Sequence, residues 1–282
     1  MNYRNLLFSF TVLFIIIAAK SDLPKEFTLK NFEKTLVKIQ ANLYASKYET
    51  TNLQYTTFLK ELKKEGKIQE YALANIDSMN WKTRQAYNDL YIEFYHRHEA
   101  YKNYPVINIS YEGAVMFCEW ITKKYNEYPK RKFKKVKFRL PNEQEWIKAA
   151  RGGLNGTLYP WGGYSLTNTK GYAMCNYAHI GDESITYNKE TGQYELRKQA
   201  SGKKLRKAVF SEPPSIVNSF PPNNFGIYNM SGNVAEMIQE KGKLKGGSMC
   251  SGGYDVRIDA IDTFEKPDID IGFRYFVEII EF

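Results

Sequence analysis

Three segments of the chain alternate apolar and polar residues with the period of an amphipathic helix. In the first, the apolar positions are Tyr55, Phe58, Leu59 and Leu62. This spacing places them on one helical face. Thr51 and Gln54 precede them at the spacing of a capping box, and Gly66 follows as a stop signal. The pattern therefore predicts a buried-face helix that begins after Thr51.

The second and third helical segments carry similar start signals. Ser110 precedes a face formed by Ala114, Phe117, Cys118 and Ile121. Asn142 and Glu145 have capping-box spacing, and Gly152-Gly153 ends the third segment. Cys118 lies on the apolar face of its helix, so the pattern predicts a buried small hydrophobe there.

Short apolar runs between these helices predict strands. They cover residues 36–39, 43–48, 104–109 and 272–279. The last of them alternates as a half-buried strand does. Residues 67–103 are aromatic and polar without a clear period, and His96 and His98 in this stretch are expected to be loop or partly buried residues. A few helices, many short strands and long loops indicate an α+β fold.

The densest run of turn-forming and oxygen-bearing residues is 220–238, FPPNNFGIYNMSGNVAEMI. Pro221-Pro222 marks a turn. A tight polar loop follows over residues 229–233, and Glu236 is expected to begin a helix. Asn233 and Glu236 have the spacing of a capping box, which requires no metal. A second glycine turn is expected at residues 245–248, KGGS.

The N-terminal segment Met1–Ala19 has the pattern of a signal peptide: a basic start, an apolar run and small residues before a cleavage point. Export of the mature protein is therefore expected, to the periplasm, the cell surface or the medium. An uncleaved anchor is the alternative, although the run is short for a membrane span, which needs about 20 apolar residues. No stable span is expected after cleavage.

The charge and the cysteines restrict the function further. The net charge of +9 becomes +8 when Arg4 is removed with the signal segment. A basic exported protein could bind acidic glycans or other anions, whereas nucleic acid is not an expected partner. The basic run 130–137 is interpreted as a solvated loop and an edge strand. Three cysteines are too few for a disulfide framework.

Seven motifs, in order, resemble those of the formylglycine-generating enzyme family, also called the sulfatase-modifying-factor domain. They are KYETTNLQY (47–55), YPVINISYEGAVMFCEW (104–120), RLPNEQEWIKAARGG (139–153), YPWGG (159–163), FPPNNFGIYNMSGNVAEM (220–237), KGGS (245–248) and IGFRY (271–275). The resemblance implies the family fold, a C-type-lectin-like variant with extensive loops. It also implies a single domain over residues 36–282, after a lead-in at 20–35, with an insertion near 182–207.

The resemblance further implies bound calcium. One family site corresponds to the Asn229 side chain, the main-chain carbonyls of Gly232 and Val234, and Glu236. Calcium takes six to eight oxygens, and a tight loop can supply carbonyls. The capping-box interpretation of Asn233 and Glu236 remains the alternative.

A second calcium site would begin with Asn176 and the carbonyl of Tyr177. The resemblance places the rest of this site before FPPN. The insertion at 182–207 interrupts the correspondence there.

The copper-binding cysteine pair of the family's oxidases is not matched. Active members carry one cysteine three residues after the GGS serine and a second five residues further on. Here the cysteine nearest that position is Cys250, two residues after Ser248, and no cysteine follows it. Because Cu(I) selects paired thiolates, the sequence does not favour a copper site. Cys250 stays the candidate catalytic residue.

Three functions are open at this point. The first is a non-catalytic, calcium-stabilised binding or structural module with an unknown protein or glycan partner. The second is an oxidase that converts a sulfatase cysteine to formylglycine. The third is a lectin-like glycan-binding module, which the aromatic content and the positive charge allow.

Overall fold

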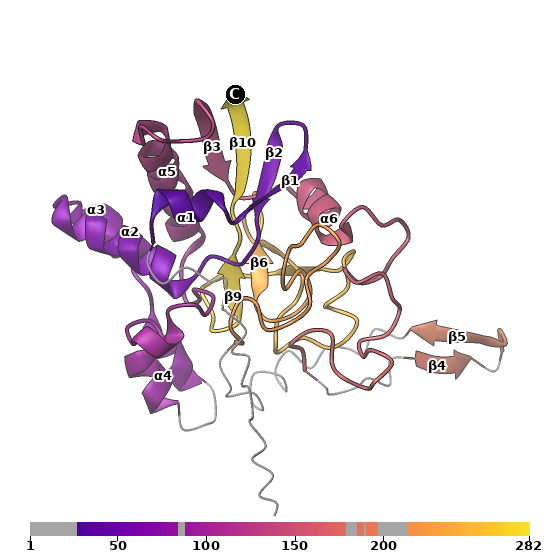
Figure 1. Cartoon of the computed structure of the whole chain (residues 1–282). Coiled ribbons are helices and arrows are strands. Elements are labelled where there is room, and N and C mark those ends of the chain that lie inside the picture. The colour runs from indigo at the N-terminus through magenta and orange to yellow at the C-terminus, as the bar shows by residue number, and fades with distance from the viewer. Residues whose placement is uncertain (1–26, 84–87, 179–184, 189, 197–213) are drawn as a thin grey trace, which may run out of the picture.

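The computed structural model describes residues 27–83, 88–178, 185–188, 190–196 and 214–282 (Figure 1). The segment 1–19 and most of the insertion 182–207 lie outside the described residues. Two four-stranded sheets and a separate hairpin form within those ranges, joined by helices and long loops. The α+β prediction is confirmed. Among these residues, no helix combines the length and apolar character needed to cross a membrane.

The first sheet brings the two ends of the described chain together. Its order is β1 (Leu36–Gln40), β2 (Leu43–Ser46), β10 (Phe276–Glu281), β3 (Lys135–Arg139), and all its pairs are antiparallel. β10 therefore lies between a strand from the start of the domain and one from its middle. β3 is an edge strand, as expected for the basic run 130–137.

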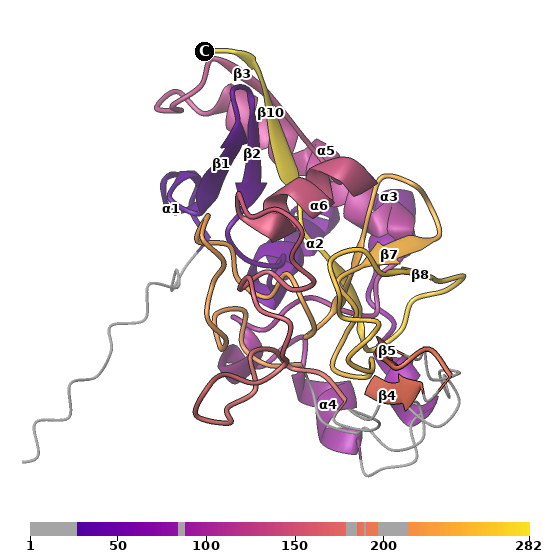
Figure 2. The same cartoon turned by 90° about the vertical axis from the view of Figure 1, so that its right-hand side faces the viewer.

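The two faces of this sheet are covered by different helices, because side chains alternate along each strand. Val277 and Ile279 of β10 pack in the large core cluster with α2 (Asn52–Lys64) and α5 (Tyr111–Glu127). Phe276, directly before Val277, packs with Trp146 of α6 (Glu143–Arg151) on the other face. Figure 1 shows α5 and α6 on opposite sides of this sheet, and in Figure 2 α6 lies in front of α5. The short α1 (Leu29–Glu33) adds Phe32 to the large cluster.

The helix starts predicted from local signals are confirmed. The Thr51 side chain accepts from the backbone N–H of Gln54, and the Gln54 amide oxygen accepts from Thr51 N–H. Asn142 and Glu145 form the same reciprocal pair. Ser110 caps α5 through the N–H of Gly113. These contacts satisfy helix N–H groups that have no partner inside the helix.

The second sheet has the order β8 (Ile261–Thr263), β7 (Lys243–Lys245), β6 (Ala235–Met237), β9 (Ile271–Phe273). β6 and β9 are parallel and the other pairs are antiparallel. The expected helix at Glu236 is therefore wrong, because the residue lies in a strand hydrogen-bonded on both sides. Asn233 and Glu236 form no capping box, since their side chains bind elsewhere.

Residues 67–103, which gave no clear pattern, form a helical subdomain beside α2. It contains α3 (Ile68–Ala74), η1 (Ser78–Thr83), α4 (Asp89–Phe94) and η2 (Glu99–Tyr101). Trp81 and Tyr95 are fully buried in it, with ring centroids 5.6 Å apart. Aromatic contacts between short helices therefore stabilise this region. Its helices are too short for a periodic apolar pattern to predict them from the sequence.

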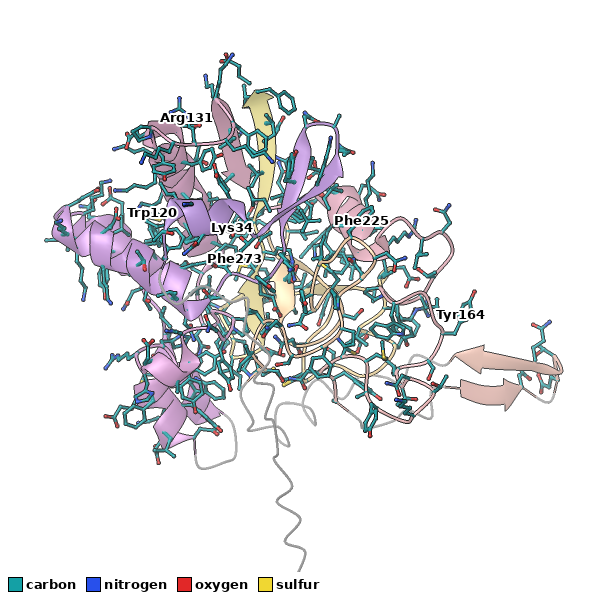
Figure 3. All side chains as sticks on the ribbon, in the orientation of Figure 1. Lys34, Trp120, Arg131, Tyr164, Phe225 and Phe273 are labelled. Carbon is teal, nitrogen blue, oxygen red and sulfur yellow. The ribbon has the colours of Figure 1, made fainter. Side chains whose placement is uncertain are left out.

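The remaining hairpin, β4 (Ile185–Asn188) and β5 (Gln193–Leu196), projects from the right of Figure 1. It is the described part of the predicted insertion. Figure 3 contrasts Phe273, in the interior, with Tyr164, on an outer loop and 73% exposed. The body of the fold is thus built on the two sheets, and the polar loop 229–234 leads directly into the second of them.

Candidate functional site

The polar loop before β6 has a backbone that few residues can adopt. Asn229, Gly232 and Asn233 have φ values of +52°, +72° and +66°. Asparagine and glycine populate this left-handed region more readily than other residues. A Cβ on Gly232 would lie 2.2 Å from the carbonyl oxygen of Asn176, so only glycine fits. The loop is therefore pressed against the segment that contains Asn176.

Glu49 lies at the centre of the loop's hydrogen bonds. Its side chain is fully buried. Asn229 Nδ2 donates to one carboxylate oxygen at 2.9 Å, and Asn233 Nδ2 donates to the other at 2.7 Å. Burial is the main reason that the pKa of Glu49 rises to about 8, and the nearby Glu236 raises it further against the opposing effects of Arg274 and the two amides. Folding therefore favours the protonated form of Glu49.

Glu236, the carboxylate predicted to bind calcium, forms a buried ion pair with Arg274. The Arg274 Nη2 donates to Oε1 at 2.7 Å, and Nε lies 3.1 and 3.2 Å from the two oxygens. Trp146 Nε1 donates to Oε2 at 2.7 Å. The exposed fractions of the Glu236 and Arg274 side chains are 1% and 0%. Both carboxylate oxygens are therefore already satisfied.

The four residues of the first calcium prediction differ in how well they fit a cation. Asn229 Oδ1 is buried and has no hydrogen-bond partner among the described residues, as expected for an oxygen that holds an ion. Gly232 and Val234 lie in the same loop and can offer only carbonyls. The Glu236 carboxylate does not fit, because Arg274 and Trp146 occupy it. Within the described ranges, no group of three His, Cys, Asp or Glu residues is arranged for a metal.

The two residues of the second calcium prediction lie beside the first loop. The Asn176 carbonyl accepts from Asn233 N–H at 2.7 Å, and the Asn176 amide donates to Ser215 Oγ at 3.2 Å. Tyr177 is buried in a small apolar cluster with Cys175. The structure thus brings the two predicted sites into contact. Residues 197–213, part of the chain expected to complete the second site, lie outside the described residues.

Cys250 is buried among apolar residues. It packs with Trp81, Val234 and Met249, and its exposed fraction is 3%. Cys118 and Cys175 lie in two other clusters, and no cysteine forms a disulfide. No second thiol therefore shares the Cys250 site, where the neighbouring sulfur is the Met249 thioether, and a copper ion that needs paired thiolates does not fit there.

Cys250 also borders a cavity of about 310 Å³ whose polar lining is mostly hydroxyl and carboxylate oxygens, together with the amine of Lys266. Ser248 Oγ donates to Asp270 Oδ2 at 3.0 Å and accepts from Cys250 N–H at 3.1 Å. Asp268 also lines the cavity. Hydroxyl and carboxylate oxygens suit hard cations or hydrogen-bonded ligands better than they suit Cu(I).

The sequence motifs contained Glu49 and Arg274, yet sequence reasoning gave them no role. A signal exists for Arg274: it is a charged residue inside the alternating apolar run 272–279. A charge at such a position needs a buried partner. Glu49 lies two residues before the capping Thr51, and nothing local indicates its contacts with Asn229 and Asn233.

Comparisons with known proteins agree with the family resemblance. The family model described as "Sulfatase-modifying factor enzyme 1-like domain" matches residues 26–279. The chain is 31% identical over 138 residues to the formylglycine-generating enzyme of Mus musculus. The aligned region covers 49% of this chain and 27% of that protein. It is 32% identical over 133 residues to the inactive C-alpha-formylglycine-generating enzyme 2 of Mus musculus, covering 47% and 30%.

These matches span less than a third of each curated relative. A catalytic and an inactive relative match almost equally, so identity does not separate the two functions. Among solved structures, CarF is similar with a TM-score of 0.54 at 21% identity, over 85% of this chain and 87% of that one. At that identity the likeness concerns the fold alone.

Loss of Arg274 should destabilise the protein far more than loss of an exposed ion pair. Arg274→Met leaves the Glu236 carboxylate buried without its counter-charge, and we expect the free energy of unfolding to fall by about 3–5 kcal/mol. Urea denaturation measures the change. The exposed pair of Lys241 and Glu112 gives the control, since Lys241→Met removes only a solvent-screened pair and should cost far less stability. Equal losses in the two variants would contradict a central role for Arg274.

The raised pKa of Glu49 gives a pH dependence with a definite sign. Between the unfolded pKa of 4.5 and the folded value of about 8, the folded protein binds a proton that the unfolded chain releases. The stability from protonated Glu49 is therefore complete below the unfolded pKa and is lost as the pH rises through the folded one. Relative to Glu49→Gln, wild-type stability in chelator should fall between pH 5 and 8 by an amount on the order of a few kcal/mol. Parallel curves for the two proteins would show that Glu49 is ionised in the folded state.

Proposed function

The chain belongs to the sulfatase-modifying factor enzyme 1-like family, and on that premise we propose that it is an exported, non-catalytic member that serves as a binding or structural module. The observation that carries the proposal is the surroundings of Cys250. This thiol packs among apolar side chains and borders a cavity lined mainly by hydroxyl and carboxylate groups. A copper-thiolate oxidase needs a second thiolate there, and the chain's two other cysteines lie in separate clusters.

The similarity to an inactive relative supports this proposal without deciding it. The oxidase remains the alternative, because an active formylglycine-generating enzyme matches at nearly the same identity. Export is proposed from the signal-like segment Met1–Ala19. The partner of the module is an unidentified protein or glycan.

We also propose that calcium braces the loop before β6. The support is the buried, unpartnered Asn229 Oδ1. The carbonyls of Gly232 and Val234 would complete the protein's contribution, while Glu236 stays with Arg274. A ligand set without a carboxylate carries no compensating charge. We therefore expect weak binding, with a dissociation constant of about 0.1–1 mM.

The oxidase alternative predicts a product that the proposal does not. Copper-loaded protein is incubated with a Cys-X-Pro-X-Arg peptide, and the products are analysed by mass spectrometry beside an active family member. We expect no aldehyde and no stoichiometric copper. Copper binding that disappears in Cys250→Ser, or any peptide aldehyde, would restore the oxidase.

Calcium should raise the melting temperature through Asn229. With about 10 mM calcium and the affinity given above, we expect an increase of about 3–5 °C that a chelator reverses. Asn229→Ala should abolish the increase. Asn224→Ala, at an exposed position of the same segment, should retain it. An unchanged melting temperature in wild-type protein would rule out calcium at this loop.

A further inference from the structure

A second cavity, of about 370 Å³, shares no lining residue with the cavity beside Cys250. Its walls come from α2, from α3 and its connection to η1, and from the residues that follow α4. Figure 1 shows these elements together at the left. The volume is within the range of about 300–1,000 Å³ that is typical of small-molecule sites.

The charged residues that line this cavity are all cationic. They are Lys60 and Lys63 of α2 and Arg97. No acidic side chain lines it, and none of the three cations has an ion-pair partner among the described residues. By contrast, Lys67 and Lys124 nearby are paired with Glu65 and Glu61. Unpaired cations around one hollow attract an anion and raise its local concentration.

His96 adds a buried hydrogen-bonding group to the same cavity. Its Nδ1 lies 2.9 Å from Asn52 Oδ1. Asn52 Nδ2 donates to the carbonyls of Tyr95 and Tyr101, so its oxygen faces the imidazole and Nδ1 carries the proton. Asn52 does not line the cavity, whereas His96 does.

The second imidazole nitrogen is therefore an acceptor. His96 Nε2 is buried and has no hydrogen-bond partner in the described part of the chain, and the residue is only 7% exposed. Burial first, then the positive charge of Arg97, lowers the pKa of His96 to about 3, so the ring is neutral near pH 7. A buried acceptor without a donor is costly, and a ligand hydroxyl would remove that cost.

An aromatic and a polar wall complete the cavity. Tyr71 presents a ring, and Lys63 Nζ lies 4.3 Å from the centre of that ring. Ser78 and Asn75 also line the cavity and offer hydroxyl and amide groups. Such a combination of a ring, cations and neutral hydrogen-bonding groups suits a ligand that is both anionic and rich in hydroxyls.

We propose that this cavity, lined by Lys60, Lys63, Tyr71, His96 and Arg97, binds a single sugar unit that carries a negative charge. The cations hold the carboxylate or phosphate group, and His96 Nε2 accepts a hydroxyl proton. The proposal gives a ligand class to the binding role proposed above and rests on it, but Cys250 does not line this cavity. The sugar-binding test therefore succeeds or fails independently of the copper and aldehyde test.

The test is calorimetric titration of the full chain with four probes. These are glucuronate, glucose 6-phosphate, neutral glucose and inorganic phosphate. One of the two charged sugars should bind with a dissociation constant of about 1 mM or tighter, and the better of the two identifies the anionic group. Glucose and inorganic phosphate should bind at least about tenfold more weakly. Inorganic phosphate that binds as well as the sugars would overturn the proposed hydroxyl contact.

Two variants and one control assign the binding to the cavity. Lys60→Gln and Arg97→Gln should each weaken it by about three- to tenfold. Lys64→Gln, an exposed lysine on the same helix that does not line the cavity, should leave affinity within about twofold. Equal affinity in Lys60→Gln and Lys64→Gln, or no binding of either charged sugar by wild-type protein, would overturn the proposal.

His96 is tested separately because it is buried. His96→Gln should reduce the preference for the better charged sugar over its matched simple anion, which is acetate for glucuronate and inorganic phosphate for glucose 6-phosphate, while leaving weak anion binding by the cations. Retention of the full preference would overturn its role. If the variant does not fold, the surface variants Lys60→Gln and Arg97→Gln still decide the matter, since both positions are exposed.

Discussion

The ion pair between Glu236 and Arg274 is the interaction on which the arrangement of the two sheets depends. Arg274 lies between β9 and β10, the strands that belong to different sheets. Besides Glu236, its guanidinium donates to the carbonyls of Ser46 and Tyr228. One planar group with five donors therefore fixes the end of β2, the polar loop and β6 relative to one another. A lysine could not reproduce these directions.

This constraint also explains why the polar loop has so little freedom. The ion pair of Glu236 and Arg274 fixes β6, which directly follows the loop. Within the loop, the Asn229 and Asn233 side chains donate hydrogen bonds to Glu49. The contact of Gly232 with the Asn176 carbonyl closes the other side. Two carboxylates and one guanidinium are thus buried within one small region. Burial of two nearby carboxylates favours a proton on one of them. That proton belongs to Glu49, because burial raises its pKa whereas Arg274 forms its ion pair with Glu236.

Local signals in the sequence predicted local structure well. Thr51 with Gln54 and Asn142 with Glu145 act over three residues, so their spacing alone indicates the helix start. The same spacing at Asn233 and Glu236 misled, because Glu236 binds Arg274, a residue distant in the chain. Tertiary contacts decide such a position. The helices between α2 and α5 were missed for the same reason, since buried aromatic contacts such as those of Trp81 stabilise them.

Of the candidate site, the sequence could supply the residue types but not their surroundings. Cys250 can be singled out from the sequence by its place after the glycine turn, yet the apolar side chains around it come from distant segments. The cationic cavity could not be read from the chain, because Lys60 and Arg97 look like ordinary surface charges until the fold places them around one hollow. Asn52 fixes the tautomer of His96 across 44 residues of sequence, and no local pattern indicates that contact.

The position of β10 between β2 and β3 has a consequence for how the protein is made. Phe276 pairs with Ala45 of β2 on one side and with Arg139 of β3 on the other. The first sheet is therefore incomplete until residues 276–281 have been synthesised. Before then, β2 and β3 expose unpaired edges that can attach to other chains. The first sheet is therefore completed only after β2 and β3 have been synthesised. A chain that stops before β10 would expose the unpaired edges of both strands, which favour aggregation.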